Sequence, residues 1–356
     1  MQAVALFPDE SPPALRVIET QRPTPAAGEA LVRTLAVGVD GSDRRIVAGD
    51  IGGDPPTGDD HLVLGHEAVG VVEDPNGTDL EAGDVVVPTV RVPTDPSSRV
   101  ARNGELDMAS AGEFHERGIT GAHGYMAEYF VSDAEYLVRI PASLADYGFF
   151  VEPASLVEKA LEQAFAARSR FDWRPSNAMV LGNGNLGLLA CARLAADERF
   201  DRSYCVGRRD RPDPTVDFIE RVGATYVDSR ETPPADVPDA HAPIDYLFEC
   251  TGHPNHALDA VHALAANGVA TLQGIPGSRR VEIDAGDFHA DLVTHNKALL
   301  GVVNSRRRHF EDAADWLAET PDDRLDALVS GRYGFADVES AFADSPETLK
   351  SVVVVE

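Results

Sequence analysis

A glycine string near the middle of the chain restricts the fold more than any other feature of the sequence. It reads Gly182-Asn183-Gly184-Asn185-Leu186-Gly187, follows the apolar run 178–181 and opens a stretch with helical spacing. In this context the first glycine makes a tight turn, the second lets a pyrophosphate approach, and the third packs helix on strand. Free N–H groups at the helix N-terminus then face the phosphates. We therefore expect these residues to bind a dinucleotide, in preference to forming a glycine-rich turn without a ligand.

Strands and helices are expected to alternate from this string to about residue 303. Helical spacing at 154–168, 186–199 and 255–266 predicts helices. Apolar, β-branched runs predict strands at 178–181, 203–206, 224–227, 244–249, 269–273 and 298–303. This alternation indicates a doubly wound parallel sheet of the Rossmann type.

The first 150 residues have a different texture. Short β-branched runs such as 30–37, 69–73 and 84–87 are separated by Gly, Pro and Asp, which is typical of a mostly-β domain. Residues 91–123 are loop-like but too long for a plain connector, so we expect a lobe or a substrate-facing loop. The last fifty or so residues return to a mixed pattern and end in a predicted strand at 351–355. At 356 residues, two domains are expected.

The charge balance excludes several partners. The formal net charge is -28, which repels nucleic acid and anionic membranes, and no apolar run approaches the ~20 residues of a membrane span. The 31 basic residues include only three lysines, Lys159, Lys297 and Lys350. Such a surface suits a protein working in molar salt, where carboxylate repulsion is screened; an ordinary acidic protein from a GC-rich genome is the alternative. Three well-separated cysteines and no secretory signal favour a reducing, cytoplasmic location.

The end of the second predicted strand bears on cofactor choice. An NAD-binding protein places Asp or Glu there for the ribose 2′-hydroxyl, whereas this chain has Gly207-Arg208-Arg209. Two guanidinium groups suit a 2′-phosphate, so NADP is preferred over NAD. Asp210 keeps NAD possible, and the alternative is that both arginines are solvated surface charges.

A polar cluster in the first half predicts a metal site. Asp40-Gly41-Ser42-Asp43, Gly65-His66-Glu67 and Glu152-Pro153 lie at the ends of apolar runs. Three converging imidazole and carboxylate groups with one open position are what a catalytic zinc requires. A single histidine in a strand is more often structural than a ligand, but its neighbours here favour a ligand.

These motifs resemble those of the zinc-type medium-chain dehydrogenases over essentially the full length, above all the glucose dehydrogenase branch in its haloarchaeal form. Where the family has Cys-Gly-Ser/Thr-Asp, this chain has Asp40-Gly41-Ser42-Asp43, and 248–252 is similar to the family's strand end beside the cofactor. The resemblance implies an α/β protein with a GroES-like, mostly-β catalytic domain at 1–153 plus 305–356. The Rossmann cofactor domain would be 154–304.

The resemblance also implies a ligand set. Asp40 takes the place of the ligand cysteine, His66 and Glu152 complete the set, and Glu67 can approach the metal. Carboxylate is a harder ligand than thiolate and also suits Mg²⁺ or Mn²⁺, but His66 favours zinc. Related proteins hold a structural zinc with four cysteines in the lobe, and this lobe has none, so we expect no structural zinc. We expect the acidic and histidine side chains of that segment to be solvated or substrate-facing: Glu105, Asp107, Glu113, His115 and Glu116.

The implied reaction is hydride transfer from C1 of an aldose, with glucose preferred, to NADP, giving glucono-1,5-lactone. Ser42 matches the family's proton-relay hydroxyl, although a helix or turn cap is equally open. By the same resemblance, Glu116 is expected to accept a hydrogen bond from a sugar hydroxyl, and Asn304 to contact the nicotinamide or the sugar. Thr251 is expected to contact the cofactor, and Glu152 to border the substrate as well. The alternatives are a polyol or alcohol dehydrogenase, or a non-catalytic NADPH-binding redox sensor, against which the retained metal cluster argues. Pairing of the strand near 298–303 across a two-fold axis would give a homodimer.

Overall fold

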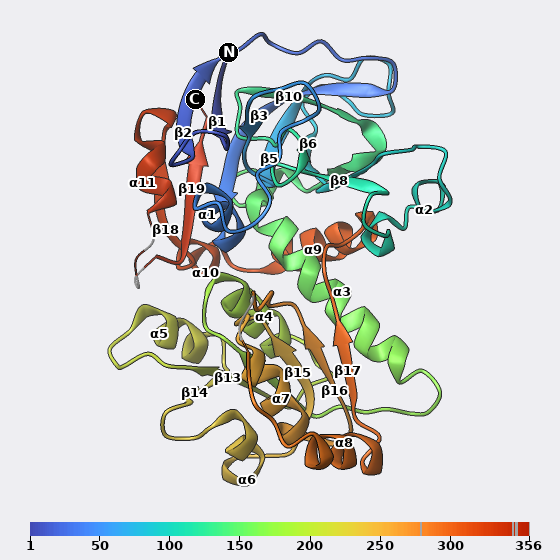
Figure 1. Ribbon diagram of the computed structural model, residues 1–356, viewed down its shortest axis with the longest axis vertical. Coiled ribbons are helices and arrows are strands. Elements are labelled where there is room, and N and C mark those ends of the chain that lie inside the picture. The colour runs from blue at the N-terminus through green and yellow to red at the C-terminus, as the bar shows by residue number, and fades with distance from the viewer. Residues whose placement is uncertain (278–279, 344, 346–347, 356) are drawn as a thin grey trace. The chain divides into compact units, whose positions relative to one another are not determined.

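The computed structural model describes residues 1–277, 280–343, 345 and 348–355. It divides into two compact units (Figure 1). Unit 1 contains Met1–Ser155 and Asn304–Glu356, and unit 2 contains Leu156–Val303. The helix α3 (Val151–Ala167) contains the boundary between them.

Unit 1 is mostly β, as the spacing of its apolar runs predicts. Its main sheet has the order β11-β6-β5-β3-β19-β18, with β10 also pairing with β3. Two smaller sheets have the orders β2-β1-β4 and β7-β8-β9. Its strands are β1 (Gln2–Phe7), β2 (Ala14–Glu19), β3 (Glu29–Val39), β4 (Leu62–Val63), β5 (Glu67–Asp74), β6 (Val85–Pro88), β7 (Arg91–Pro93), β8 (Phe114–Arg117), β9 (Gly121–Ala122), β10 (Tyr129–Asp133), β11 (Leu137–Arg139), β18 (Val329–Tyr333) and β19 (Lys350–Val354). Its helices are α1 (Gly41–Val47), α2 (Arg99–Arg102), α9 (Arg307–Glu319), α10 (Asp322–Asp326) and α11 (Val338–Phe342).

The core of unit 1 comes from the apolar faces of these strands. Val32, Val37 and Val39 of β3 pack with Val72 of β5 and Val353 of β19, all buried. Because β19 from the C-terminal end pairs with β3 from the N-terminal end, the last fifty or so residues complete the first domain's sheet. The lobe is more regular than the loop-like sequence suggests, since β7, β8 and β9 form a sheet of their own within it.

Unit 2 is a parallel six-stranded sheet with the order β14-β13-β12-β15-β16-β17. This is the doubly wound Rossmann order, so the predicted fold class is confirmed. Helix α4 packs on β12 and β13, and α7 packs on β15 and β16 (Figure 1). The elements are β12 (Asn177–Leu181), α4 (Asn185–Ala195), β13 (Arg202–Gly207), α5 (Pro214–Arg221), β14 (Thr225–Asp228), α6 (Val237–Ala240), β15 (Ile244–Glu249), α7 (Pro254–Ala263), β16 (Leu264–Leu272), α8 (Ala285–Thr294) and β17 (Ala298–Gly301).

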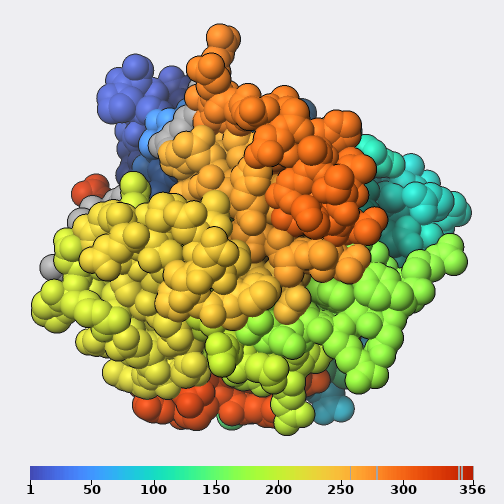
Figure 2. Space-filling model, turned by 90° about the horizontal axis from the view of Figure 1, so that it is seen from below, coloured from blue at the N-terminus to red at the C-terminus, as the bar shows by residue number. Residues whose placement is uncertain are grey.

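One end of the unit 2 sheet carries exposed apolar side chains. Strand β17 is an edge strand, and every residue of α8 is at least partly exposed. Figure 2 looks onto unit 2 and shows the orange atoms of this part of the chain at the surface. Ile275, Val293 and Val303 are exposed there. In the described residues, no helix has the length and apolarity needed to cross a bilayer.

Lys159 and Lys350 are buried and Lys297 is half-buried, although lysine is ordinarily a surface residue. Lys159 donates to the carbonyl of Val303, Lys297 to that of Val261, and Lys350 to a carboxylate. The surface cations of this acidic protein are therefore arginines.

Candidate active site

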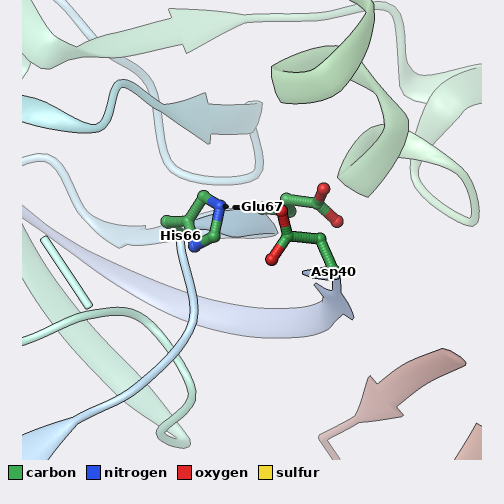
Figure 3. A group of neighbouring side chains, drawn as sticks. All are labelled: Asp40, His66 and Glu67. Carbon is green, nitrogen blue, oxygen red and sulfur yellow. Dashed lines mark ion pairs between the residues drawn. The ribbon is translucent and has the colours of Figure 1, made fainter. Parts of the chain in front are cut away.

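Two paired strands bring the predicted metal ligands together. Strands β3 and β5 are antiparallel, with Gly38 opposite Glu67. Asp40 directly follows β3 and His66 directly precedes β5, so their side chains meet at one edge of the sheet (Figure 3). Gly65 makes the turn into His66 with a φ of 87°, and a Cβ there would lie 2.7 Å from Val37. A side chain at that position is excluded by both conformation and space.

Asp40 has two roles at once. It is the N-cap of α1: its Oδ1 accepts from the N–H of Asp43 at 2.8 Å, and Asp43 Oδ2 accepts from the N–H of Asp40 at 3.0 Å. The other oxygen, Oδ2, lies 3.9 Å from Nε2 of His66. The N-cap of α1 is therefore Asp40, and Ser42 is the second residue of that helix.

Asp43 faces the far side of the imidazole. Its Oδ1 lies 3.5 Å from His66 Nδ1, and neither buried atom has a hydrogen-bond partner within the described part of the chain. Metal-binding histidines characteristically direct their second nitrogen to a carboxylate, which fixes the ring. Burial lowers the pKa of His66, but the charges of Asp43 and Asp40 outweigh it, so the pKa is raised well above its ordinary value.

Glu67 is buried against Lys350. The lysine Nζ donates to both carboxylate oxygens, at 2.8 and 2.6 Å. A Cβ at Gly38 would lie 2.2 Å from Glu67 Oε2, so this carboxylate occupies the space that glycine leaves. Burial raises the pKa of Glu67, and the charge of Lys350 opposes that rise.

Glu152 is the second residue of α3 and is buried. Burial raises its pKa to about 8; His66 opposes the rise, and the charges of Glu67 and Asp40 add to it. Glu152 therefore interacts electrostatically with Asp40 and His66, but it is not in the group of ligand atoms that lie within 4.8 Å of one another, which is Asp40, His66 and Glu67 in the described residues.

The donor set fits a divalent metal. Asp40, His66 and Glu67 offer ligand atoms that all lie within 4.8 Å of one another. Asp43 and Glu152 add two further buried carboxylates, against one buried lysine. Clustered buried carboxylates repel one another, and a dication neutralises them. Imidazole with carboxylate oxygen is a ligand chemistry that zinc accepts.

The two predicted sugar contacts are also in unit 1. Glu116 of β8 accepts from Arg91 Nε at 2.9 Å through Oε1. Asn304 is buried with a φ of 56°, and its Oδ1 has no partner among the residues described. A buried unpaired amide oxygen is costly unless a ligand satisfies it.

The glycine string borders a cleft of about 800 Å³ in unit 2. The predicted residues that line it are Gly182, Asn183, Gly184, Gly207, Arg208, Arg209 and Thr251. Asn185, Leu186 and Gly187 form the first turn of α4 instead. Sequence reasoning missed Arg230, His253 and His256, which also line the cleft. Asn304 lies in unit 1 and is not part of this lining.

Two glycines in or next to this cleft allow close packing of the protein, and a third leaves the backbone open to a ligand. A Cβ at Gly187 would lie 2.0 Å from the carbonyl of Gly182, and one at Gly207 would lie 2.6 Å from Asn183 Oδ1. A Cβ at Gly184 meets nothing within 4 Å, so the backbone is open on that side. This is the surface that a dinucleotide pyrophosphate approaches.

Comparison with known proteins decides the family. Residues 145–355 match the model "Glucose dehydrogenase C-terminus", and residues 26–142 match "Alcohol dehydrogenase GroES-like domain". The chain is 68% identical over 354 residues to glucose 1-dehydrogenase 2 of Haloterrigena turkmenica, covering 99% of both chains. The chain belongs to the glucose dehydrogenase branch of the zinc-type medium-chain dehydrogenases. A second relative is the glucose 1-dehydrogenase of Haloferax mediterranei. The two sequences are 54% identical over 355 residues, and the alignment covers 99% of each chain.

A solved structure of the same family has this fold. The Haloferax mediterranei glucose dehydrogenase in complex with NADP, zinc and gluconolactone superposes with a TM-score of 0.95 at 53% identity. The match covers 100% of this chain and 99% of the other. The predicted family and the GroES-like plus Rossmann fold class are therefore confirmed.

Asp43 and Lys350 belong to the site, but the sequence analysis gave neither of them a role. The three-residue spacing of Asp40 and Asp43 is that of a capping box, so the sequence carried a signal for Asp43. Lys350 carried none, because it is 283 residues from Glu67 and reaches it only through the pairing of β19.

Proposed function

We propose that this protein is a zinc- and NADP-dependent glucose 1-dehydrogenase, which oxidises C1 of D-glucose to glucono-1,5-lactone. One hydride passes from C1 to the nicotinamide and one proton leaves the anomeric hydroxyl, so NADPH and H⁺ form with the lactone. The observation that carries the proposal is the joint presence of the Asp40–His66–Glu67 donor cluster and the glycine-lined cleft. The relative with NADP, zinc and gluconolactone supports it.

Asp40, His66 and Glu152 are proposed to hold the metal, with Glu67 next to it. When bound, the metal supplies a positive charge that favours loss of the anomeric hydroxyl proton. Asp43 Oδ1 lies 3.5 Å from His66 Nδ1 and is proposed to orient the ring when the metal is bound, and the capping hydrogen bond of α1 positions Asp40. We expect one metal per chain and no structural zinc in the lobe.

Ser42 is proposed to carry the proton away from the sugar. Ser42 lies in the first turn of α1, two residues after Asp40, and so is close to the metal cluster. Glu116 and Asn304 are proposed to bind sugar hydroxyls, since each has an oxygen able to accept a hydrogen bond. An acceptor-lined site rejects substrates that lack those hydroxyls.

Arg208 and Arg209 are proposed to select NADP, with NAD as a weaker cofactor. Arg208 is exposed at the cleft, and the N–H of Arg209 is held by the hydroxyl of Tyr226 at 2.6 Å. Two guanidinium groups give a 2′-phosphate more hydrogen bonds than a 2′-hydroxyl.

The domain limits and the assembly complete the proposal. We assign residues 1–153 and 305–356 to catalysis and 154–304 to cofactor binding. The exposed apolar side chains near the edge strand β17 support a homodimer formed there. The substrate is a free small sugar, and the cytoplasm is the proposed location.

A panel of initial rates in molar KCl tests this function. D-Glucose, D-galactose, D-xylose, sorbitol and ethanol are each assayed with NADP and with NAD. We expect glucose with NADP to exceed ethanol in kcat/KM by a factor on the order of 10⁴. Turnover of sorbitol or ethanol without turnover of glucose would instead support the polyol or alcohol dehydrogenase. Binding of NADPH without turnover of any of these substrates would support the redox sensor.

A further inference from the structure

A second cavity lies in unit 1, outside the metal cluster. Its volume is about 210 Å³, and it is bordered by the lobe, by the residues after β10 and by the start of α9. Its lining includes Thr89, Arg91, Leu106, Ser305, Arg306 and Arg307. At ~30 Å³ per water, this volume holds a polyatomic ligand.

The charge of this cavity is opposite to that of the chain. Acidic residues outnumber basic ones by 59 to 31 in the whole sequence. The cavity is lined by three arginines and one acid, Glu135. Arg307 donates to the backbone carbonyl of Glu135 at 3.0 Å and pairs with Glu311 at 3.0 Å. A local excess of guanidinium groups in so acidic a protein attracts an anion.

Two buried side chains in the lining have unused hydrogen-bonding capacity. Thr89 is 6% exposed, and its Oγ1 has no partner in the described part of the molecule. Arg91 is 7% exposed; Nε donates to Glu116 and Nη1 to the carbonyls of Leu106 and Asp107. Its Nη2 makes no hydrogen bond to any residue that the structure describes. A buried hydroxyl such as that of Thr89 is ordinarily hydrogen-bonded, so it points to a ligand.

The start of α9 adds to this potential. Ser305, Arg306 and Arg307 line the cavity; Arg306 is the N-cap residue of α9, and its N–H donates to His309 Nδ1 at 3.3 Å. The positive end of a helix dipole favours an anion. A guanidinium presents two parallel donors, a geometry that matches an oxyanion better than a halide.

We propose that this cavity binds a small oxyanion of the phosphate type, held by Arg91, Arg306 and Thr89. A second consequence rests on the proposed function. Because Arg91 also holds Glu116, an anion on Arg91 competes for its guanidinium and changes how firmly Glu116 is held. Occupancy of the cavity therefore changes the KM for the sugar and leaves kcat unchanged.

Binding is tested first with inorganic phosphate alone. Isothermal titration calorimetry of the zinc-loaded protein at constant molar KCl should give saturable binding. Arg306→Gln and Thr89→Val should each weaken it by about tenfold. Arg308→Gln is the matched control, because Arg308 neighbours Arg306 but does not line the cavity. Absence of saturable phosphate binding, or equal weakening by Arg308→Gln, overturns the proposal. Thermal unfolding of each variant without phosphate verifies that it is folded.

Two further arms identify the source of the phosphate and the coupling. If glucose 6-phosphate binds tighter than phosphate, the site serves a phosphorylated sugar; if it binds no tighter, the site serves the free ion.

The glucose KM should change severalfold with saturating phosphate in the parent protein and stay constant in Arg306→Gln. An unchanged KM in the parent protein overturns the coupling. If glucose is not oxidised at all, the proposed function fails, whereas phosphate binding by calorimetry is unaffected.

Discussion

Lys350 and Glu67 form a buried ion pair beside the metal cluster, with Nζ 2.8 and 2.6 Å from the two carboxylate oxygens. Strand β19 brings the lysine to β3, and β3 carries Gly38 opposite the glutamate. The pair therefore connects the C-terminal strand with the ligand-bearing edge of the sheet.

Removing the lysine should destabilise the protein strongly. In Lys350→Met the carboxylate of Glu67 stays buried without its partner, and breaking such a pair costs about 3–5 kcal/mol. Unfolding by guanidinium chloride measures the loss. The double variant Glu67→Gln/Lys350→Met removes both charges and should recover most of it. A single variant as stable as the parent protein would contradict the role assigned to the pair.

A methyl group at Gly38 should disturb the same pair from the other side. The added Cβ of Gly38→Ala would lie 2.2 Å from Glu67 Oε2, so the carboxylate must move away from Lys350. We expect a loss of about 1–3 kcal/mol, as for other overpacked sites. Gly334→Ala is the control, since a Cβ there meets nothing within 4 Å and the backbone φ is -76°. Equal stability of the two variants would show that Glu67 has room to move.

The two roles of Asp40 are separable by substitution. Asparagine still caps a helix but lacks the negative charge that a metal prefers, whereas alanine does neither. In the metal-free protein, Asp40→Asn should match the parent in stability and Asp40→Ala should lose about 1 kcal/mol. Zinc affinity, measured by competition with a chelator, should fall by at least about tenfold in both. Zinc affinity retained by Asp40→Ala would exclude Asp40 as a ligand.

Acid stability should depend on Asp197 in unit 2. Burial raises the pKa of Asp197, but hydrogen bonds from Arg199 outweigh burial and lower it below its ordinary value of 3.8. A carboxyl with a lowered pKa stabilises the fold above its unfolded-state pKa, and this is lost as pH falls through the folded pKa. The difference in unfolding free energy between parent and Asp197→Asn, about 1.5–3 kcal/mol at neutral pH, should therefore shrink below about pH 4. The exposed control Asp201→Asn should change stability by less than about 0.5 kcal/mol at every pH. A difference that persisted at pH 2 would be inconsistent with the lowered pKa.

How far the sequence predicts this structure depends on whether the signal is local. The glycine string and its flanking strand and helix are encoded within a few residues, so β12 and α4 were predictable. The start of α3 at Val151 was placed too late because Pro153 marked the first turn, and Glu152 lies inside the helix. The sheet β7-β8-β9 was missed because its strands are two to four residues long, too short for a period to show. The Lys350–Glu67 pair depends on the order of strands in the sheet, which no local pattern encodes.

The absence of a thiolate from the metal cluster is what most distinguishes this chain from the family pattern. Elemental analysis of the dialysed parent protein and of His66→Ala tests the proposed site most directly. We predict one zinc per parent chain and much less than one in His66→Ala, with the variant still folded by circular dichroism. Two zinc ions per parent chain, or full zinc retention in His66→Ala, would contradict a single oxygen- and nitrogen-ligated site at Asp40, His66 and Glu152.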